Sequence, residues 1–302
     1  MELEALLGGK VLAYITSDRP AFETAIDWQV IDPLIEQLEA IGKTGTLILF
    51  LYTRGGDTSA AWNIVSLLRL YCDRLVAVIP HRAHSAGTII AIGADELVMT
   101  RHATLGPIDP HETNPLIPKG DDGTPFPVSV EAVSGYIELA RSELGVKDPD
   151  VILKELSAHV HPLVLGQAYR SRAQVKALAK RLLRRQIKEP GMIEQAASFL
   201  CGGCGSHDYT ITRREAREDL GLQVRYPEGK LDSLVKDIYS GLRSELMGPA
   251  EKLTERDDVK SVKAGFLESL SGGTTYYSYD YQVTGGTPKL AQQGWHNNRM
   301  PC

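Results

Sequence analysis

The residues with the strongest chemical potential lie in the segment HRAHSAGTIIAIG (81–93). Ser85 stands there between the apolar run LVAVI (75–79) and a helical pattern of small and apolar residues. Small neighbours allow a sharp turn from strand into helix, although the usual Gly-x-Ser-x-Gly spelling of such a turn is absent. Free N–H groups and the helix dipole stabilise a developing negative charge at that point. Two interpretations remain open: a nucleophilic serine, or a serine that only caps its helix.

A Gly-Gly pair follows a second apolar run. TRGGD (53–57) comes directly after TLILFLY (46–52). Two glycines after a parallel strand can point a bare backbone N–H into the crevice at the strand's carboxyl end, where such sheets bind ligands. With the amide of Ala86, they would form an oxyanion hole with two donors. A plain Gly-rich turn is the alternative, whereas a phosphate cradle is disfavoured because Gly-x-Gly-x-x-Gly and a Walker lysine are both absent.

Strands and helices alternate around these two motifs. Continuous apolar runs indicate strands at 46–52, 75–79 and 96–99, because strands of parallel sheets are buried on both faces. Helical spacing indicates helices before the first strand (30–41) and between the strands (60–71 and 86–94), with Asp57, Thr58 or Ser59 as the N-cap of 60–71. This order predicts an α/β fold with a parallel sheet and right-handed crossovers.

Composition places the chain among soluble globular proteins. Its 302 residues are 43% hydrophobic and 24% charged, with 33 Lys and Arg against 38 Asp and Glu, so nucleic-acid binding is not expected. Four scattered cysteines favour a reducing compartment. Residues 1–9 carry no basic region typical of a secretory signal, and no apolar run approaches the roughly 20 residues of a membrane helix. We therefore expect a soluble, cytoplasmic protein without membrane association.

The remaining sequence supplies a long loop, further helices and a polar tail. The proline-rich segment 107–127 is predicted to be a loop, and helices are predicted at 129–144, 149–160, 170–188 and 231–247. Thr212 and Glu215 have capping-box spacing. The charges of helix 170–188 are all basic, which indicates a solvated face or a docking face for a separate partner. The Gly- and Tyr-rich tail after residue 271 is expected to be flexible or ordered by a neighbour.

The motifs, taken together and in this order, resemble the superfamily of Clp proteases, signal peptide peptidases and crotonases. The match is closest to the serine dehydrogenase proteinase (SDH-type) family. TRGGD resembles the Gly-Gly oxyanion segment, and AHSAGTIIAIGADELVM resembles the nucleophile segment with Ser85 in the nucleophile's place. ATLGPIDP is similar to the SDH loop signature, and SHDYTITRREAREDLGL (206–222) resembles the closing helix, with one extra residue before the Gly.

This resemblance covers about residues 11–224 and implies both fold and activity. The implied fold is a Clp/crotonase-like parallel sheet with repeated β-β-α and β-α crossover units and flanking helices, plus a partly flexible C-terminal extension. A proteinase domain at 1–226 and an extension at 227–302 follow. The implied activity is hydrolysis of peptide bonds through Ser85, with Gly55, Gly56 and Ala86 at the oxyanion hole. Relatives pack into rings or stacks, so a homo-oligomer is also implied.

The general base is less well defined. A serine nucleophile needs a histidine oriented by a carboxylate, or a desolvated lysine, to take its proton. The Clp histidine is missing, because its place falls at Ile108-Asp109 inside GPIDP. The Clp catalytic aspartate matches Asp208 when the Glu215-Ala216 pairs are aligned. Signal peptide peptidases use instead a lysine downstream of the serine.

Three side chains can take the place of the missing histidine. His207 adjoins Asp208 just before the closing helix, in the region that approaches the nucleophile in relatives. Lys119 lies in the proline-rich loop and could act as a base if burial lowers its pKa. His111 closely follows the GPIDP turn. Two more possibilities stay open, namely His161 in the segment HPLVLG as the base, and an enzyme that has lost its activity.

Two further interpretations have weaker support. Cys201-Gly-Gly-Cys204 is a single C-x-x-C without a second pair at metal spacing, so a flexible turn is preferred to zinc or redox chemistry, and no metal or cofactor is expected. A crotonase-like acyl-CoA enzyme would use the same oxyanion geometry, but the Ser85 turn disfavours it. A Clp-fold scaffold without activity would explain the missing histidine. The sequence therefore favours a serine peptidase acting on a peptide or protein substrate.

Overall fold

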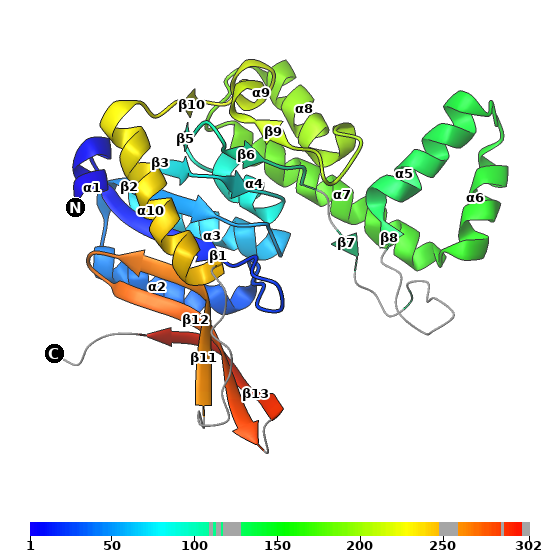
Figure 1. The fold of residues 1–302 in the computed structure, drawn as a ribbon. Helices are drawn as coiled ribbons and strands as arrows, with labels where there is room; N and C mark the ends of the chain where they lie inside the picture. Colours follow the sequence, from blue (N-terminus) through cyan, green and yellow to red (C-terminus); the bar gives the residue numbers. More distant parts are fainter. Residues whose placement is uncertain (109–110, 113–115, 117–127, 248–258, 285–286, 298–302) are drawn as a thin grey trace.

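The computed structural model describes residues 1–108, 111–112, 116, 128–247, 259–284 and 287–297. A twisted sheet forms its centre, with strands in the order β10-β5-β3-β2-β1-β11-β12-β13 (Figure 1). The five strands from β10 to β1 are parallel to one another. They are β1 (Lys10–Thr16), β2 (Thr44–Tyr52), β3 (Cys72–Ile79), β5 (Glu96–Met99) and β10 (Val224–Arg225).

Helices cover both faces of this sheet. One face packs against α2 (Ile31–Ile41), α3 (Thr58–Leu70), α4 (Ala86–Ile92), α7 (Pro162–Leu183), α8 (Pro190–Ser198) and α9 (Arg213–Glu218). The other face packs against α1 (Glu2–Leu7) and α10 (Gly229–Met247). The sequence-based expectation of an α/β fold with a parallel sheet is confirmed.

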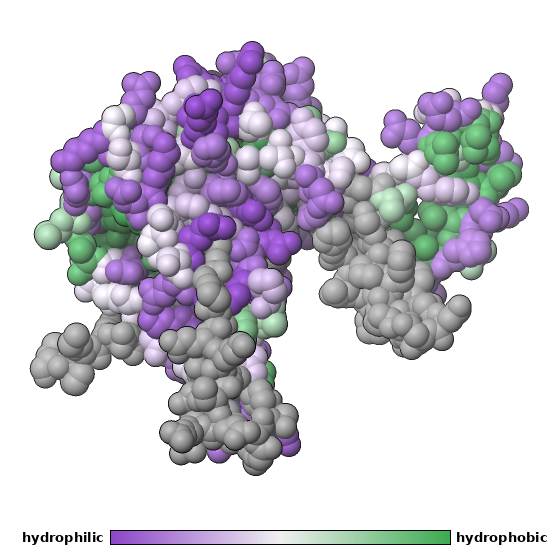
Figure 2. Space-filling view, in the orientation of Figure 1, coloured by the Kyte–Doolittle hydropathy of each residue, from purple (hydrophilic) through white to green (hydrophobic). Residues whose placement is uncertain are grey.

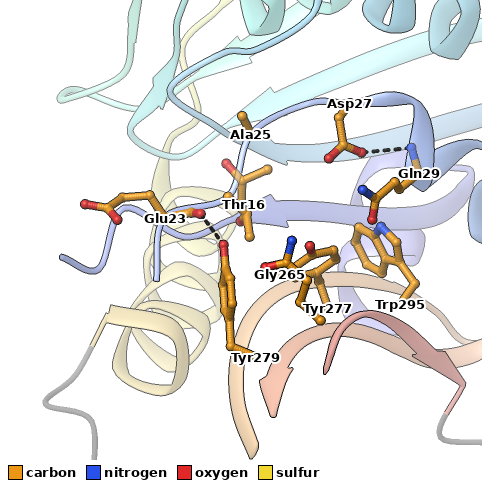
Figure 3. Close-up of a pocket in the computed structure, with 11 residues that line it drawn as sticks. Thr16, Glu23, Ala25, Asp27, Gln29, Gly265, Tyr277, Tyr279 and Trp295 are labelled. Carbon is orange, nitrogen blue, oxygen red and sulfur yellow. Dashed lines mark hydrogen bonds between the residues drawn. The ribbon is translucent and has the colours of Figure 1, made fainter. Parts of the chain in front are cut away.

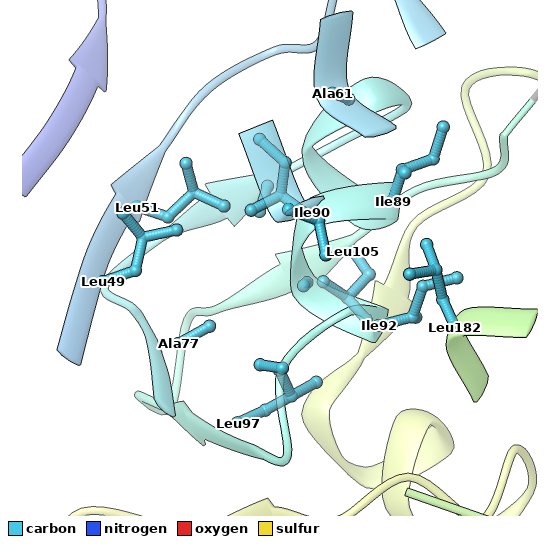
Figure 4. Packing of buried hydrophobic residues seen from close by; sticks show 14 of the residues in the cluster. Leu49, Leu51, Ala61, Ala77, Ile89, Ile90, Ile92, Leu97, Leu105 and Leu182 are labelled. Carbon is cyan, nitrogen blue, oxygen red and sulfur yellow. The ribbon is translucent and has the colours of Figure 1, made fainter. Parts of the chain in front are cut away.

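The side-chain alternation of β2 shows why its sequence is apolar throughout. Leu47, Leu49 and Leu51 belong to the larger core under α3 and α4, whereas Ile48 and Phe50 belong to the core under α10. Successive side chains of a strand point to opposite faces, so a strand covered on both sides has no polar face. Each fully buried side chain of this size contributes roughly 1.5–3 kcal/mol. Figure 4 shows the larger core around α4, with Leu182 of α7 closing one side.

The helix and strand predictions agree closely with the structure. The runs at 46–52, 75–79 and 96–99 are β2, β3 and β5, and the helices expected around them are α2, α3 and α4. Asp57 is the N-cap of α3 and accepts the amide hydrogen of Ala60 (2.7 Å). Thr212 accepts the amide hydrogen of Glu215 (3.3 Å), as the capping box predicts.

The helix predicted at 170–188 begins earlier than expected. His161 caps α7 by accepting the amide hydrogen of Leu163 at Nδ1 (3.2 Å), and Pro162 occupies the first helical position. Its basic charge is partly met within the chain, because Lys176 (2.8 Å) and Lys180 both form ion pairs with Glu194 of α8. A separate partner at 170–188 stays a prediction.

The segment between β6 and α7 leads into a projecting arm (Figure 1). It contains β7 (His111–Glu112), β8 (Val128–Ser129), α5 (Val130–Glu138), a π-helical turn (Leu139–Glu143) and α6 (Pro149–His159). Val133, Val160 and Val164 form a small cluster of their own inside it. Apolar side chains gather on the surface of the arm in Figure 2, and exposed ones include Leu144, Val151, Leu153 and Leu163.

The C-terminal region differs from the expectation of a flexible tail. It forms β11 (Val259–Ser269), β12 (Gly273–Thr284) and β13 (Thr287–Asn297), which continue the central sheet as an antiparallel unit. β11 pairs directly with β1, and the tyrosines of β12 are buried or partly buried. The two-domain boundary at 226 stays a prediction, but the strands after it share one sheet with the strands before it.

A buried glutamine ties α2 to the turn between β11 and β12. Gln37 is 1% exposed, and its Nε2 donates to the carbonyl of Gly273 (3.1 Å) and to Thr275 Oγ1 (3.1 Å). Its Oε1 accepts from the Ser269 hydroxyl (2.7 Å). Buried polar groups must be paired in this way, because each unpaired one carries its full desolvation cost.

We predict that Gln37→Ala lowers the free energy of unfolding by about 2–4 kcal/mol, because it leaves several buried groups unpaired. Glu39→Ala, at an exposed position of the same helix, is the matched control and should change it by less than about 0.5 kcal/mol. Urea unfolding of the two variants measures the difference. Equal stability of both variants would show that the glutamine does not hold the C-terminal strands to α2.

Candidate active site

Ser85 lies on a strained turn between a short strand and a helix. β4 (Arg82–Ala83) leads into it, and α4 begins at Ala86. Ser85 has φ 52° and ψ −117°, a backbone conformation that residues other than glycine rarely adopt. Its side chain makes no capping hydrogen bond, although it occupies the N-cap position, so the interpretation of a simple helix cap is wrong. The side chain is half-buried.

A small sheet holds this turn in place. β4 pairs with β6 (Thr104–Leu105), and β6 pairs with β9 (Ile211–Thr212). The buried Thr88 hydroxyl donates to the carbonyl of Ala83 (2.9 Å) and accepts the amide hydrogen of Gly106 (3.1 Å). These contacts over-determine the backbone around Ser85, which is the condition under which a strained residue persists.

The Gly-Gly pair lies directly against Ser85. Gly55 has φ 124°, and a Cβ placed on it would lie 2.7 Å from the Ser85 Cβ. Gly56 has φ 144°, and a Cβ there would lie 2.1 Å from the carbonyl oxygen of Ile26. Only glycine fits both the backbone conformation and the space. The two motifs singled out from the sequence are therefore in contact in the folded protein.

Thr53 joins these two segments by hydrogen bonds. Its amide donates to the Arg82 carbonyl (3.1 Å), and its carbonyl accepts the amide hydrogen of His84 (3.1 Å). Its hydroxyl oxygen accepts the amide hydrogen of Gly55 (3.1 Å) and the Thr16 hydroxyl (3.0 Å). The Gly55 amide is thus engaged inside the loop. The amide of Ala86 is in the first turn of α4, where helical amides have no partner four residues earlier.

His84, directly before Ser85, was not singled out from the sequence. Its Nε2 lies 2.8 Å from Thr104 Oγ1, and its ring packs against Gly106. Burial, together with the positive charge of Arg82, lowers the pKa of His84 from 6.5 to about 4, so its ring is neutral at pH 7. Its position next to Ser85 is the sequence signal that could have identified His84. The residue that holds its ring, Thr104, belongs to β6 and is not adjacent in the sequence.

The structure locates some candidate bases and not others. His207 and Asp208 are exposed and lie just before β9. His207 is near enough to His84 for its charge to lower the pKa of that residue. His161 is used as the cap of α7. Lys119 and the side chain of His111 lie outside the described residues, so their positions relative to Ser85 stay predictions.

In this α/β fold, a Gly-Gly turn meets a serine at the start of a short helix, at the end of the parallel strands. Residues 31–118 match the family described as ClpP-like SDH-type serine proteinase. The resemblance drawn from TRGGD, the Ser85 segment and ATLGPIDP is therefore confirmed over that range.

Two proteins of one organism are similar to the chain over a longer stretch. The uncharacterized protein MJ0137 of Methanocaldococcus jannaschii is 28% identical over 193 residues, which are 64% of this chain and 58% of that protein. The uncharacterized protein MJ1495 of the same organism is 26% identical over 176 residues, 58% of this chain and 51% of that protein. The chain thus spans little more than half the length of these curated relatives.

Two solved structures illustrate the range of similar proteins. A substrate-peptide complex of the 1510-N membrane-bound stomatin-specific protease is 17% identical, with 75% of this chain and 80% of that chain covered and a TM-score of 0.40. ClpP1 from Listeria monocytogenes is 13% identical, with 76% and 98% covered and a TM-score of 0.39.

The remaining expectations from the sequence concern metals and membranes. Cys204 Sγ donates to the carbonyl of Phe199 (3.1 Å), and Cys201 is buried. In the part of the chain that the structure describes, no group of three or more potential metal ligands is found. None of the helices described is both long and apolar enough to cross a lipid bilayer.

We predict that Gly56→Ala destabilises the protein by about 2–4 kcal/mol, because its Cβ would overlap the backbone of Ile26 at a φ unfavourable for alanine. Gly45→Ala in β2 is the control, since no atom lies within 4 Å of a Cβ at that position. Thermal and urea unfolding measure both variants. A Gly56→Ala protein as stable as Gly45→Ala would contradict the tight backbone contact.

The depressed pKa of His84 predicts a pH-dependent stability. The unfolded chain takes up this proton near pH 6.5 and the folded chain only near pH 4, so stability falls as the pH is lowered between these values. The loss attributable to His84 is up to about 3 kcal/mol. Between pH 7 and pH 4.5, the free energy of unfolding measured in urea should fall less for His84→Gln than for the wild type. A His84 NMR titration midpoint at pH 6.5 would refute this assignment.

Proposed function

We propose that the protein is a serine peptidase that hydrolyses peptide bonds through an acyl-enzyme on Ser85. The observation that carries this proposal is the backbone of Ser85, strained at φ 52° and without a capping role, in contact with Gly55. A strained turn of this kind presents a hydroxyl at a helix N-terminus, where a developing charge is stabilised. The match of residues 31–118 to a serine proteinase family supports the same conclusion.

The reaction begins with attack of Ser85 Oγ on the substrate carbonyl carbon. The hydroxyl proton passes to the general base, and the carbonyl oxygen becomes an oxyanion. We assign the amides of Gly56 and Ala86 as its donors, because the Gly55 amide already donates to Thr53. Gly55 supplies the close approach to Ser85 instead. The C–N bond then breaks, the base returns its proton to the leaving amine, and water hydrolyses the acyl-enzyme.

His207 with Asp208 remains our first candidate for the base, ahead of Lys119 and His111. His207 precedes β9, the strand that pairs with β6 beside the Ser85 turn, and its charge is felt at His84. His207 is exposed, so this role requires the ring to turn toward Ser85 when substrate covers the site. His84, which is neutral, directly precedes Ser85 and positions the Ser85 turn through its hydrogen bond with Thr104. A cytoplasmic location and assembly into a homo-oligomer belong to the same proposal.

Labelling with a fluorophosphonate tests the nucleophile. We predict modification of Ser85 in the wild type, with loss of the label and at least about a 1,000-fold loss of peptide hydrolysis in Ser85→Ala. Ser66→Ala, which removes an exposed hydroxyl of α3, is the control and should keep both. Absence of labelling, under conditions that modify a control serine hydrolase, would favour a crotonase-like acyl-CoA enzyme or an inactive scaffold instead.

The base is tested by comparing four single variants. His207→Ala should lower kcat by about 100-fold or more and leave the folded state unchanged, because His207 is exposed. Lys119→Ala, His111→Ala and His84→Gln are measured beside it at several pH values. Full turnover in His207→Ala with loss of turnover in Lys119→Ala would replace the histidine mechanism by a Ser–Lys dyad.

A further inference from the structure

A polar and aromatic cavity lies beside the Gly-Gly segment. It has a volume of about 210 Å³ and is formed between the loop that precedes α2 and the C-terminal strands (Figure 3). Thr16 and Asp27 come from the N-terminal side, and Tyr277, Tyr279 and Trp295 come from β12 and β13. The cavity therefore joins regions of the chain that are far apart in sequence, and all the residues that line it lie outside the range that matches the proteinase family.

Aromatic rings form one wall of this cavity. The Tyr277 ring lies 5.6 Å from those of Tyr279 and Trp295, in edge-to-face arrangements. Gly265 of β11 makes room for them, because a Cβ there would lie 3.4 Å from the Tyr277 Cβ and 3.6 Å from the Trp295 ring. The Tyr279 hydroxyl donates to the backbone carbonyl of Glu23 (2.8 Å), which fixes that ring against the opposite loop.

Asp27 supplies negative charge to the opposite wall. Its carboxylate accepts the amide hydrogen of Gln29 (2.9 Å), and among the described residues no lysine or arginine contributes to the shift of its pKa. The residues that line the cavity include neither Lys nor Arg. Burial raises the pKa of Asp27, and the charge of Asp57 adds to the effect. The Glu23 carboxylate points away from the rings in Figure 3, so Asp27 is the charged group that faces them.

A carboxylate opposite tyrosine and tryptophan rings favours a cation. Ring faces attract ammonium and guanidinium groups, and a partly buried carboxylate is stabilised by a positive partner. The aliphatic stem of lysine or arginine can pack along such rings while its head reaches the carboxylate. A neutral apolar side chain of equal length could pack along the same rings, but it would leave Asp27 without a positively charged partner.

The cavity is connected to Ser85 through the backbone of Ile26. The Ile26 amide donates to the Gly55 carbonyl (2.8 Å), and its carbonyl accepts the amide hydrogen of Asp57 (2.7 Å). Its neighbours in sequence, Ala25 and Asp27, line the cavity. Thr16 also lines it and donates to Thr53, whose hydroxyl holds the Gly55 amide. One layer of backbone thus separates the cavity from the segment assigned to the oxyanion.

We infer that this cavity is a specificity site that binds a lysine or arginine side chain of the peptide substrate close to the scissile bond, with Asp27 opposite the cationic head and Tyr277 and Trp295 along the stem. The inference rests on the proposed peptidase function for its place in the reaction. The binding of the cationic side chain can be measured without that reaction.

Binding to the Ser85→Ala protein tests the site apart from catalysis. The probes are two peptides of alanines that differ only in a central lysine or norleucine, titrated by calorimetry. We expect the lysine peptide to bind at least about tenfold more tightly, the equivalent of one favourable ion contact. Adding Asp27→Asn should remove this preference, because asparagine keeps the acceptor for Gln29 but not the charge. Adding Asp32→Asn, an exposed carboxylate of α2, is the control and should retain it.

A second variant tests the aromatic wall. Trp295→Leu should reduce the preference for lysine over norleucine at least about threefold, with an unchanged circular dichroism spectrum as the check on folding. Equal affinity for the two peptides in the Ser85→Ala protein would overturn the inference. So would a preference that survives Asp27→Asn.

The outcomes separate this inference from the proposed function. A preference for lysine together with failure of fluorophosphonate labelling would show a cation-binding cavity in a protein that is not a serine peptidase, and the assignment to a peptidase would be wrong. Labelling of Ser85 without any preference for the lysine peptide would support the peptidase proposal and contradict the proposed specificity site. Labelling with kcat/KM at least about tenfold higher for the lysine peptide than for the norleucine peptide, lost in Asp27→Asn, is the expected result.

Discussion

The contact of bare backbone at Gly55 and Gly56 is the constraint on which the rest of the structure depends. Ser85 on one side and Ile26 on the other leave no room for a side chain. This contact brings together three segments that each follow a strand of the parallel sheet, at the edge where its carboxyl ends meet. Strain in the Ser85 backbone is tolerated because Thr53 and Thr88 both form hydrogen bonds with the chain directly before it. The close packing around Gly55 and Gly56 therefore both makes this edge of the sheet rigid and holds the Ser85 hydroxyl in place.

Local sequence was sufficient to predict the centre of the fold and to single out the Gly-Gly and Ser85 segments. The runs of β2 and β3 are apolar on both faces, and no polar periodicity competes with that pattern. Asp57 and Thr212 act as caps through atoms only a few residues away, which is why spacing predicts them. The SDH-type resemblance then joined the two glycines to the serine, and the match over residues 31–118 confirms it.

Other features depend on partners that are distant in sequence. The strands β12 and β13 look like a polar, Gly-rich tail because the buried residues of β12 are Thr275, Tyr277 and Ser278 rather than aliphatic ones, and β13 adds none among its described residues. β11 itself is recognised as a strand only once β1 is beside it. The environment of His84 is set by Thr104, and that of Asp27 by Tyr277 and Trp295. The members of each such pair lie too far apart in the sequence for a short local pattern to contain both.

The contacts of the segment after β1 with α10 and β11 have a consequence for the order in which the protein is made. Thr24 donates its hydroxyl hydrogen to Ala264 across 240 positions of the chain, and Ser17 donates to Leu246 across 229. Contacts of such long range form late, because the intervening chain must first be synthesised and closed. The Ser85 turn is complete much earlier during translation than the wall that faces Asp27. A nascent chain therefore carries the serine before it carries the surface against which a substrate side chain would rest.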